Sequence, residues 1–83
     1  DLHKVVMRVD KDILKHLREQ KFYNGFVSET EVKGKIEMTF LSSSLEGFAR
    51  WFMMFGDQAE IVSPQSLKTR IHEIASEIKN KTK

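Results

Sequence analysis

The histidines are the first residues to consider for chemistry in this chain, because imidazole binds metals and acts as a general base near neutral pH. There are three, His3, His16 and His72, and each lies without a second histidine or carboxylate at metal-ligand spacing. His72-Glu73 resembles the start of a zinc-binding helix, but Ser76 occupies the place of the second histidine. We therefore expect surface histidines and no metal site.

The other reactive side chains also lack the arrangements that catalysis needs. No serine lies in a Gly-x-Ser-x-Gly motif, and the four glycines form no phosphate-binding loop. Glu29, Glu31 and Glu37 lie on presumed strands, where we interpret them as solvated charges rather than an acid–base pair. Zero cysteines exclude disulfides and thiolate chemistry. The sequence therefore predicts no enzyme, no catalytic residue and no cofactor.

Lys4 and Arg8 have the clearest binding chemistry. In the alternating run His3–Val9 they project from the side opposite three apolar residues, onto the sheet face that covering helices would leave open. The guanidinium fork of Arg8 suits phosphate or carboxylate. The sequence leaves a simpler interpretation open, in which both cations only aid solubility.

Composition indicates one small globular domain. The chain has 83 residues, of which 40% are hydrophobic and 31% charged, and its net charge of +2 is too small to indicate nucleic-acid binding by itself. The longest apolar run, Trp51–Phe55, is far shorter than the roughly 20 residues that cross a bilayer. We expect a soluble cytoplasmic domain without a membrane partner. Because the first residue is Asp1, we also expect that residues 1–83 were excised from a larger protein.

Hydrophobic periodicity in the first half predicts a strand, a short helix and a β-hairpin. His3–Val9 alternates with period two, and Asp10 or Asp12 would cap a helix that continues to about Gln20. The chain looks irregular from Phe22 to Gly25. Two extended runs follow, from Phe26 to Val32 and from Ile36 to Leu41, and Lys33-Gly34 between them predicts a tight turn.

The second half predicts a helix, a strand and a final helix. Ser43 and Glu46 fit a capping box that begins a helix, and Gly56 is placed for a left-handed C-cap. Ala59–Val62 has the length of a strand. Pro64 suits the first turn of the last helix, with Ser63 as a cap. Its apolar stripe consists of Leu67, Ile71, Ile74, Ala75 and Ile78.

Aromatic residues form a stripe at helical spacing, with Phe48, Phe52 and Phe55 at i, i+4 and i+7. Such spacing is typical of a core face rather than of a base-stacking surface, which usually lies on a sheet. Trp51 lies off this stripe. It is our candidate interface residue, at the edge of the core or against a neighbouring domain.

The element order β-α-β-β-α-β followed by a helix predicts an α+β fold, a ferredoxin-like sandwich with an additional C-terminal helix. One sheet face would be covered by two helices. The other face would meet water, a ligand, the extra helix or another subunit.

The segment Leu45–Ile71 has the most specific pattern of the chain. It carries Arg50-Trp51, Phe55-Gly56, Ala59–Val62, Pro64 and Leu67-Lys68 in this order and spacing. In these residues, and in a first strand VVMRVD and a hairpin FVSETEVKGKIEMTF, the chain resembles the C-terminal extension (WCX) domain of bacterial WYL-domain transcriptional regulators.

The resemblance implies a domain that follows a WYL domain and a winged helix-turn-helix DNA reader, and that helps in dimerisation and in completing the site of a nucleotide or single-stranded nucleic-acid effector. Arg8 matches a basic position of the family's first strand. Asn24, Val27 and Ser28 stand where the family usually has His and Gln. We therefore expect a regulatory and homo-oligomerisation module; the alternative is a stand-alone single-stranded nucleic-acid-binding module.

Overall fold

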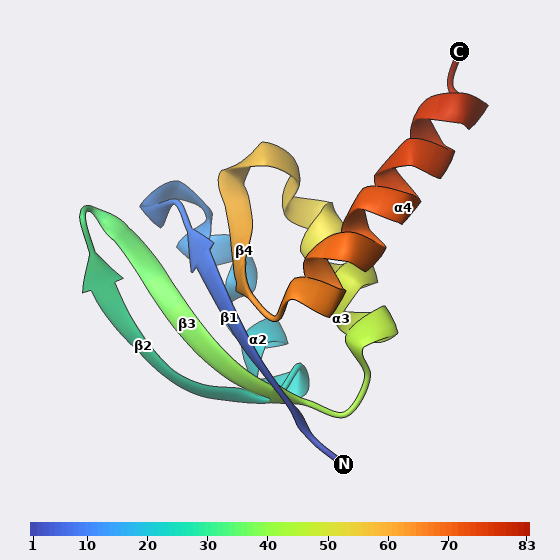
Figure 1. Ribbon diagram of the computed structural model, residues 1–83. Helices are drawn as coiled ribbons and strands as arrows, with labels where there is room; N and C mark the ends of the chain where they lie inside the picture. Colours follow the sequence, from blue (N-terminus) through green and yellow to red (C-terminus); the bar gives the residue numbers. More distant parts are fainter.

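The structure, a computed structural model, describes residues 1–83 and contains one sheet covered by helices (Figure 1). The strands are β1 (His3–Val9), β2 (Phe26–Val32), β3 (Lys35–Ser42) and β4 (Ala59–Ser63). The helical elements are η1 (Lys11–Ile13), α1 (Leu14–Leu17), α2 (Gln20–Tyr23), α3 (Leu45–Phe52), η2 (Met53–Gln58) and α4 (Gln65–Lys81). The sheet is antiparallel throughout and has the order β2-β3-β1-β4.

The hairpin β2-β3 turns where the sequence predicts. Lys33 and Gly34 have φ values of 52° and 81°, and Val32 pairs with Lys35 on either side of them. Positive φ at both central residues is typical of the type I′ turn, whose twist matches that of the flanking strands. The prediction of a tight Lys33-Gly34 turn is confirmed.

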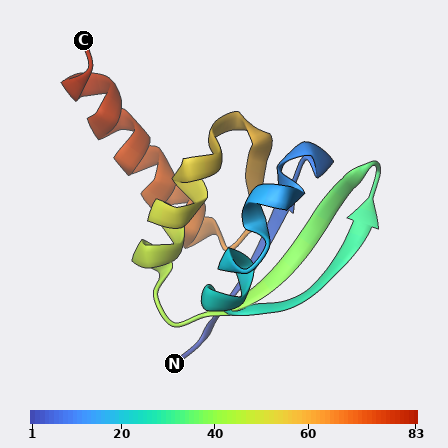
Figure 2. The same cartoon turned by 180° about the vertical axis from the view of Figure 1, so that it is seen from behind.

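The core lies on one face of the sheet. Inward-facing residues of the two central strands are buried, as their alternation predicts: Val5, Met7, Val9, Ile36, Met38 and Phe40. Phe48, Phe52 and Phe55 pack onto them from α3 and η2 and are also buried, which confirms the aromatic stripe as core. Figure 2 shows α1, α2 and α3 over this same face, so the opposite face carries no helix.

The first covering helix is broken, contrary to the prediction of one helix to Gln20. η1, α1 and α2 together replace it, and neither Asp10 nor any other residue caps them through a side chain. Ile13 and Leu17 are buried, but the next four residues, Arg18 to Lys21, offer no apolar side chain to the core. The backbone leaves the helical region at Arg18, and a new turn begins at Gln20 and continues to Tyr23, into the stretch predicted to be irregular.

α3 begins and ends differently from the prediction. Its N-cap is Ser44, whose hydroxyl accepts a hydrogen bond from the Gly47 amide at 3.0 Å, so the proposed Ser43–Glu46 capping box is wrong. The helix ends at Phe52 and continues as η2, and Gly56 interrupts this 3₁₀ segment with φ 59° and ψ −128°. Gly56 thus has the positive φ that was predicted, but not the left-handed cap conformation.

α4 confirms the predicted last helix, although Ser63 makes no cap hydrogen bond. Leu67 and Ile74 are buried against the domain, and Ile71 is half-buried. Ala75 is exposed, and Ile78 is 48% exposed, so the predicted stripe is buried only along its first half. The reason is visible in Figure 1, where the C-terminal turns of α4 extend past the body of the domain.

The fold is therefore α+β, with a four-stranded antiparallel sheet and a C-terminal helix, as predicted at that level. It departs from the regular ferredoxin-like sandwich that we expected, because three short helical segments replace the first covering helix. No helix combines the length and the apolar character that spanning a bilayer requires.

Candidate functional site

The sheet face without helices holds the cations singled out from the sequence. We call it the open face. Strand pairing places Arg8 between Glu37 on β3 and Glu60 on β4, and Thr30 on β2 lies beyond Glu37. Because side chains alternate along strands and paired residues share a face, these four form one row across the sheet.

Arg8 is held in this row by an ion pair. Its Nε donates to Glu37 Oε1 at 2.9 Å, and the two side chains are 37% and 26% exposed. The two terminal nitrogens of the guanidinium have no side-chain partner. Arg8 is thus oriented by Glu37 and keeps the four N–H groups of its two terminal nitrogens for a ligand, but the carboxylates on either side weaken its attraction for an isolated anion.

Lys4 lies on the same face, four residues from Arg8. It pairs with Leu41 on β3, is exposed and makes no ion pair. At about 3.3 Å per residue, Lys4 and Arg8 are roughly 13 Å apart along β1. The tertiary structure therefore brings them to one surface but not to one point, and a ligand that contacts both must be extended.

Asn24, Val27 and Ser28, singled out from the sequence as possible ligand contacts, lie in two different places. Ser28 pairs with Thr39 and lies on the open face, one cross-strand row away from the row of Arg8. The register of β2 shifts between Phe26 and Ser28, so Val27 lies within this irregularity. Asn24 follows α2, and its side-chain amide donates to the Gln20 carbonyl at 2.8 Å. Only the β2 residues can therefore contribute to the open face.

Trp51, the candidate interface residue, packs inside the domain. It is 9% exposed, and its ring makes edge-to-face contacts with Phe40, Phe48 and Phe55 at centroid distances of 5.2–5.7 Å. The indole Nε1 donates to Gln20 Oε1 at 3.0 Å, so the buried donor is satisfied. Contact with a neighbouring domain would be limited to the edge of the ring beside Gln20.

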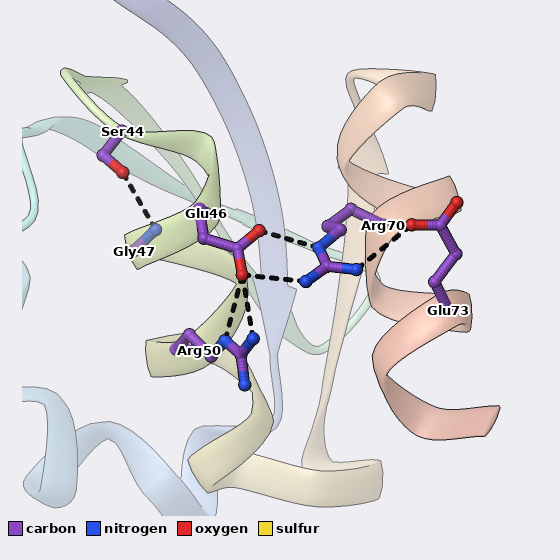
Figure 3. A network of polar contacts seen from close by, with 6 residues as sticks. All are labelled: Ser44, Glu46, Gly47, Arg50, Arg70 and Glu73. Atoms are coloured by element: carbon purple, nitrogen blue, oxygen red, sulfur yellow. Dashed lines mark hydrogen bonds and ion pairs between the residues drawn. The ribbon is translucent and has the colours of Figure 1, made fainter. Parts of the chain in front are cut away.

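A polar network that sequence reasoning missed joins α3 to α4 (Figure 3). Arg70 donates through Nε and Nη2 to the two oxygens of Glu46 at 2.7 and 3.0 Å, and through Nη1 to Glu73 at 3.2 Å. Arg50 donates to Glu46 Oε2 from the other side at 2.9 and 3.1 Å. The i, i+4 spacing of Glu46 and Arg50 and the i, i+3 spacing of Arg70 and Glu73 were signals in the sequence, but the contact of Arg70 with Glu46 between the two helices had none.

The hydrogen bonds from Arg70, and then those from Arg50, lower the pKa of Glu46 from 4.5 to about 2. The same contacts with Glu46 and Glu73 raise the pKa of Arg70. All these side chains lie at the surface, where water screens their attraction. The network is therefore a fixed connection between two helices and lies away from the open face.

The largest surface hollow lies on the side of the helices rather than on the open face. It is an open groove of about 910 Å³ between the α1–α2 region and η2. Lys15, His16 and Arg18 line it and form no ion pair, and Tyr23 and Met54 expose 83% and 69% of their surface beside them. Glu19 also lines the groove and offsets one of these cations, but the remaining positive charge and the aromatic ring suit an anionic ligand with a flat apolar part.

No metal-binding group forms in the structure. His3 lies on β1, His16 on α1 and His72 on α4, and nowhere do three His, Cys, Asp or Glu side chains meet at ligand distance. The titratable side chains are thus placed for ion pairs and surface contacts.

The model of one protein family, described as the WCX domain, matches residues 1–79. No curated protein matches the chain. The match covers every strand and nearly all of α4, so it concerns the whole fold.

Proposed function

Because the chain belongs to the WCX domain family, which is regulatory rather than catalytic, we propose that it is the C-terminal regulatory module of a WYL-type bacterial transcriptional regulator. WCX domains are associated with WYL-domain transcriptional regulators. In this proposal residues 1–83 form one domain of a larger cytoplasmic protein, next to a WYL domain and a helix-turn-helix DNA reader. The domain contributes to effector sensing and to the pairing of subunits.

The observation that carries the sensing role is the open face. It is the one side of the sheet that the chain's own helices leave uncovered, and it displays Arg8 with two unpaired guanidinium nitrogens. Lys4 extends the cationic contact along β1. An extended anionic effector, such as a short single strand held between this face and a neighbouring domain, fits this arrangement of two separated cations.

The number of cationic contacts sets the expected salt dependence. Two phosphate contacts to a single strand predict a slope of log affinity against log salt no steeper than about −1.4. Because Glu37 already pairs with Arg8, the affinity of the isolated chain should be low. Most of the binding free energy would then come from the neighbouring domain.

The test compares the chain alone with a protein that also contains the adjacent WYL domain. Short single-stranded DNA is titrated against wild type, Arg8→Ala, Lys4→Ala and the control Lys79→Ala, an exposed cation at the far end of α4. We expect weak binding by the chain alone, and a roughly tenfold loss in the larger protein for Arg8→Ala but not for the control. Equal affinities of wild type, Arg8→Ala and Lys4→Ala would refute the open-face proposal.

The alternative function, a stand-alone single-strand binder, is favoured by the groove beside α1. Lys15, Arg18 and the exposed Tyr23 ring offer cations and a stacking surface in one place. This alternative predicts tight, salt-sensitive binding by the chain alone and a loss of affinity in Arg18→Ala. Such a result with unchanged Arg8→Ala would replace the first proposal by the second.

A further inference from the structure

Large exposed apolar side chains gather at one end of the molecule. Seven such residues are exposed. Four of them, Leu2, Phe22, Tyr23 and Leu41, line one hollow near the start of β1, and a fifth, Val27, lies at the beginning of β2. We call these five the end patch. Strand pairing explains their convergence, because β1 begins opposite the end of β3, and the amide of Leu41 donates to the Gly25 carbonyl just after α2.

A hollow of about 340 Å³ opens within the end patch. Leu2, Phe22, Tyr23 and Leu41 line it together with serines, Asn24, two glycines and the edge of Phe48. None of its eleven lining residues is charged, although 31% of the residues in the chain are. Depletion of charge and enrichment of aromatic rings is the composition of an interface core.

We propose that the end patch pairs two copies of this chain. The patch carries both a protruding group and a recess: the Tyr23 side chain is 83% exposed, and the hollow beside it has room for an aromatic ring. Around a two-fold axis, each copy inserts its ring into the hollow of the other. This inference rests on the subunit pairing of the proposed function and names the surface that performs it.

The charge distribution favours a second copy as the occupant. Two uncharged patches meet without like-charge repulsion, whereas the free edge of the sheet at β2 does not allow this. If β2 paired with itself about Thr30, Glu29 would lie opposite Glu31 of the second copy, which is destabilising. The projecting part of α4 offers one large exposed apolar residue, Ile78, between charged neighbours.

The area of the patch predicts a weak dimer. Two exposed rings and three aliphatic side chains supply roughly 500 Å² of apolar surface per copy. The total of about 1,000 Å² is at the lower end of specific interfaces. Association should therefore depend on concentration, with dimers forming in the micromolar range and above.

The experiment is sedimentation equilibrium of the chain from roughly 10 µM to 1 mM, a range that brackets the expected dissociation constant. Tyr23→Ser removes the ring, and Ser43→Lys places a charge at the hollow; both residues are exposed, so neither change disturbs the core. Ile78→Ser is the matched control, since it removes an exposed apolar side chain elsewhere. Circular dichroism verifies that each variant folds.

We expect a wild-type dimer whose dissociation constant rises at least about tenfold in Tyr23→Ser and in Ser43→Lys, and stays unchanged in Ile78→Ser. If the wild type dimerises and only Ile78→Ser weakens it, pairing uses α4; this overturns the end patch and leaves the proposed function standing. If the wild type is monomeric up to 1 mM, the partner of the patch is not a second copy, and the pairing role of the domain fails with it.

Discussion

Phe40 makes three aromatic contacts, two of which join the sheet to α3, and its replacement by leucine tests how the core is held together. Its side chain is fully buried, and its ring centroid lies 5.0 Å from Phe48, 5.7 Å from Trp51 and 5.9 Å from Phe26. All three contacts are edge-to-face. Leucine restores much of the apolar volume but none of the ring geometry.

The expected cost follows from these contacts. Each edge-to-face pair contributes about 0.5–1.5 kcal/mol beyond buried area, and leucine contacts recover part of the three. We therefore expect Phe40→Leu to lower the free energy of unfolding by about 2–3 kcal/mol. A domain of this size has a total of roughly 4–12 kcal/mol, so the variant should fold but with a large loss.

Urea denaturation of dilute protein measures this loss. With a slope of about 1 kcal/mol per molar urea, the midpoint should fall by about 2–3 M. Phe22→Leu is the control: this ring makes one edge-to-face contact, with Phe26, and is 63% exposed, so we expect a loss below about 0.5 kcal/mol. A double-mutant cycle with Phe48→Leu should give a coupling of about 1 kcal/mol. Equal midpoints of Phe40→Leu and Phe22→Leu, or zero coupling, would refute the assigned role of ring geometry.

Three further predictions concern positions with specific contacts. Gly25→Ala should lower the free energy of unfolding in urea by more than about 2 kcal/mol, because Gly25 has φ +88° and an added Cβ would collide with the Leu41 carbonyl. Gly34→Ala, at φ +81° with open space around it, should cost only about 1 kcal/mol. Similar costs for the two variants would contradict the close approach of Gly25 to the Leu41 carbonyl. Lowering the pH from 4.5 to 2 should reduce the urea midpoint of the wild type more than that of Glu46→Gln. The reason is that the pKa of Glu46 is about 2 in the folded protein, so acid protonates Glu46 first in the unfolded state and thereby favours unfolding. Equal decreases of the urea midpoint with pH in the two proteins would count against the network. Trp51→Phe should lower thermal stability by about 1–2 kcal/mol through the lost Gln20 hydrogen bond and lost volume, as read by circular dichroism, and an unchanged Tm would argue against both contacts.

The open face and the end patch are two neighbouring surfaces suited to different kinds of contact, one polar and one apolar. Around Arg8 the chain exposes charges in a row, held by cross-strand pairing. At the start of β1 it exposes apolar side chains without a charge among the residues that line the hollow. Leu41 belongs to both, because it lies beside Lys4 on β3 and also lines that hollow. A second copy seated on the end patch would thus lie next to the open face, and its presence would affect how an effector reaches Lys4.

Periodicity by itself determined the strands and the buried side of the central ones. Side chains of a strand alternate between two faces, and in His3–Val9 and Ile36–Leu41 one of these faces is apolar, so that face must be the buried one. The turn at Lys33-Gly34 was equally local, since it depends on backbone preferences of two residues. Local rules of this kind need no knowledge of the rest of the chain.

Tertiary structure alone decided where helices break and which polar groups meet. The helix expected up to Gln20 ends early because a helix of this length is held by packing, and Arg18 to Lys21 present no apolar side chain to the core. Arg70 contacts Glu46, which lies 24 residues earlier in the sequence. Ile78 stays exposed because the C-terminal turns of α4 extend past the part of the domain that covers its first turns. Likewise, the end patch unites residues that are distant in sequence. Contacts of this kind depend on where separate elements come to lie, which periodicity along one element does not encode.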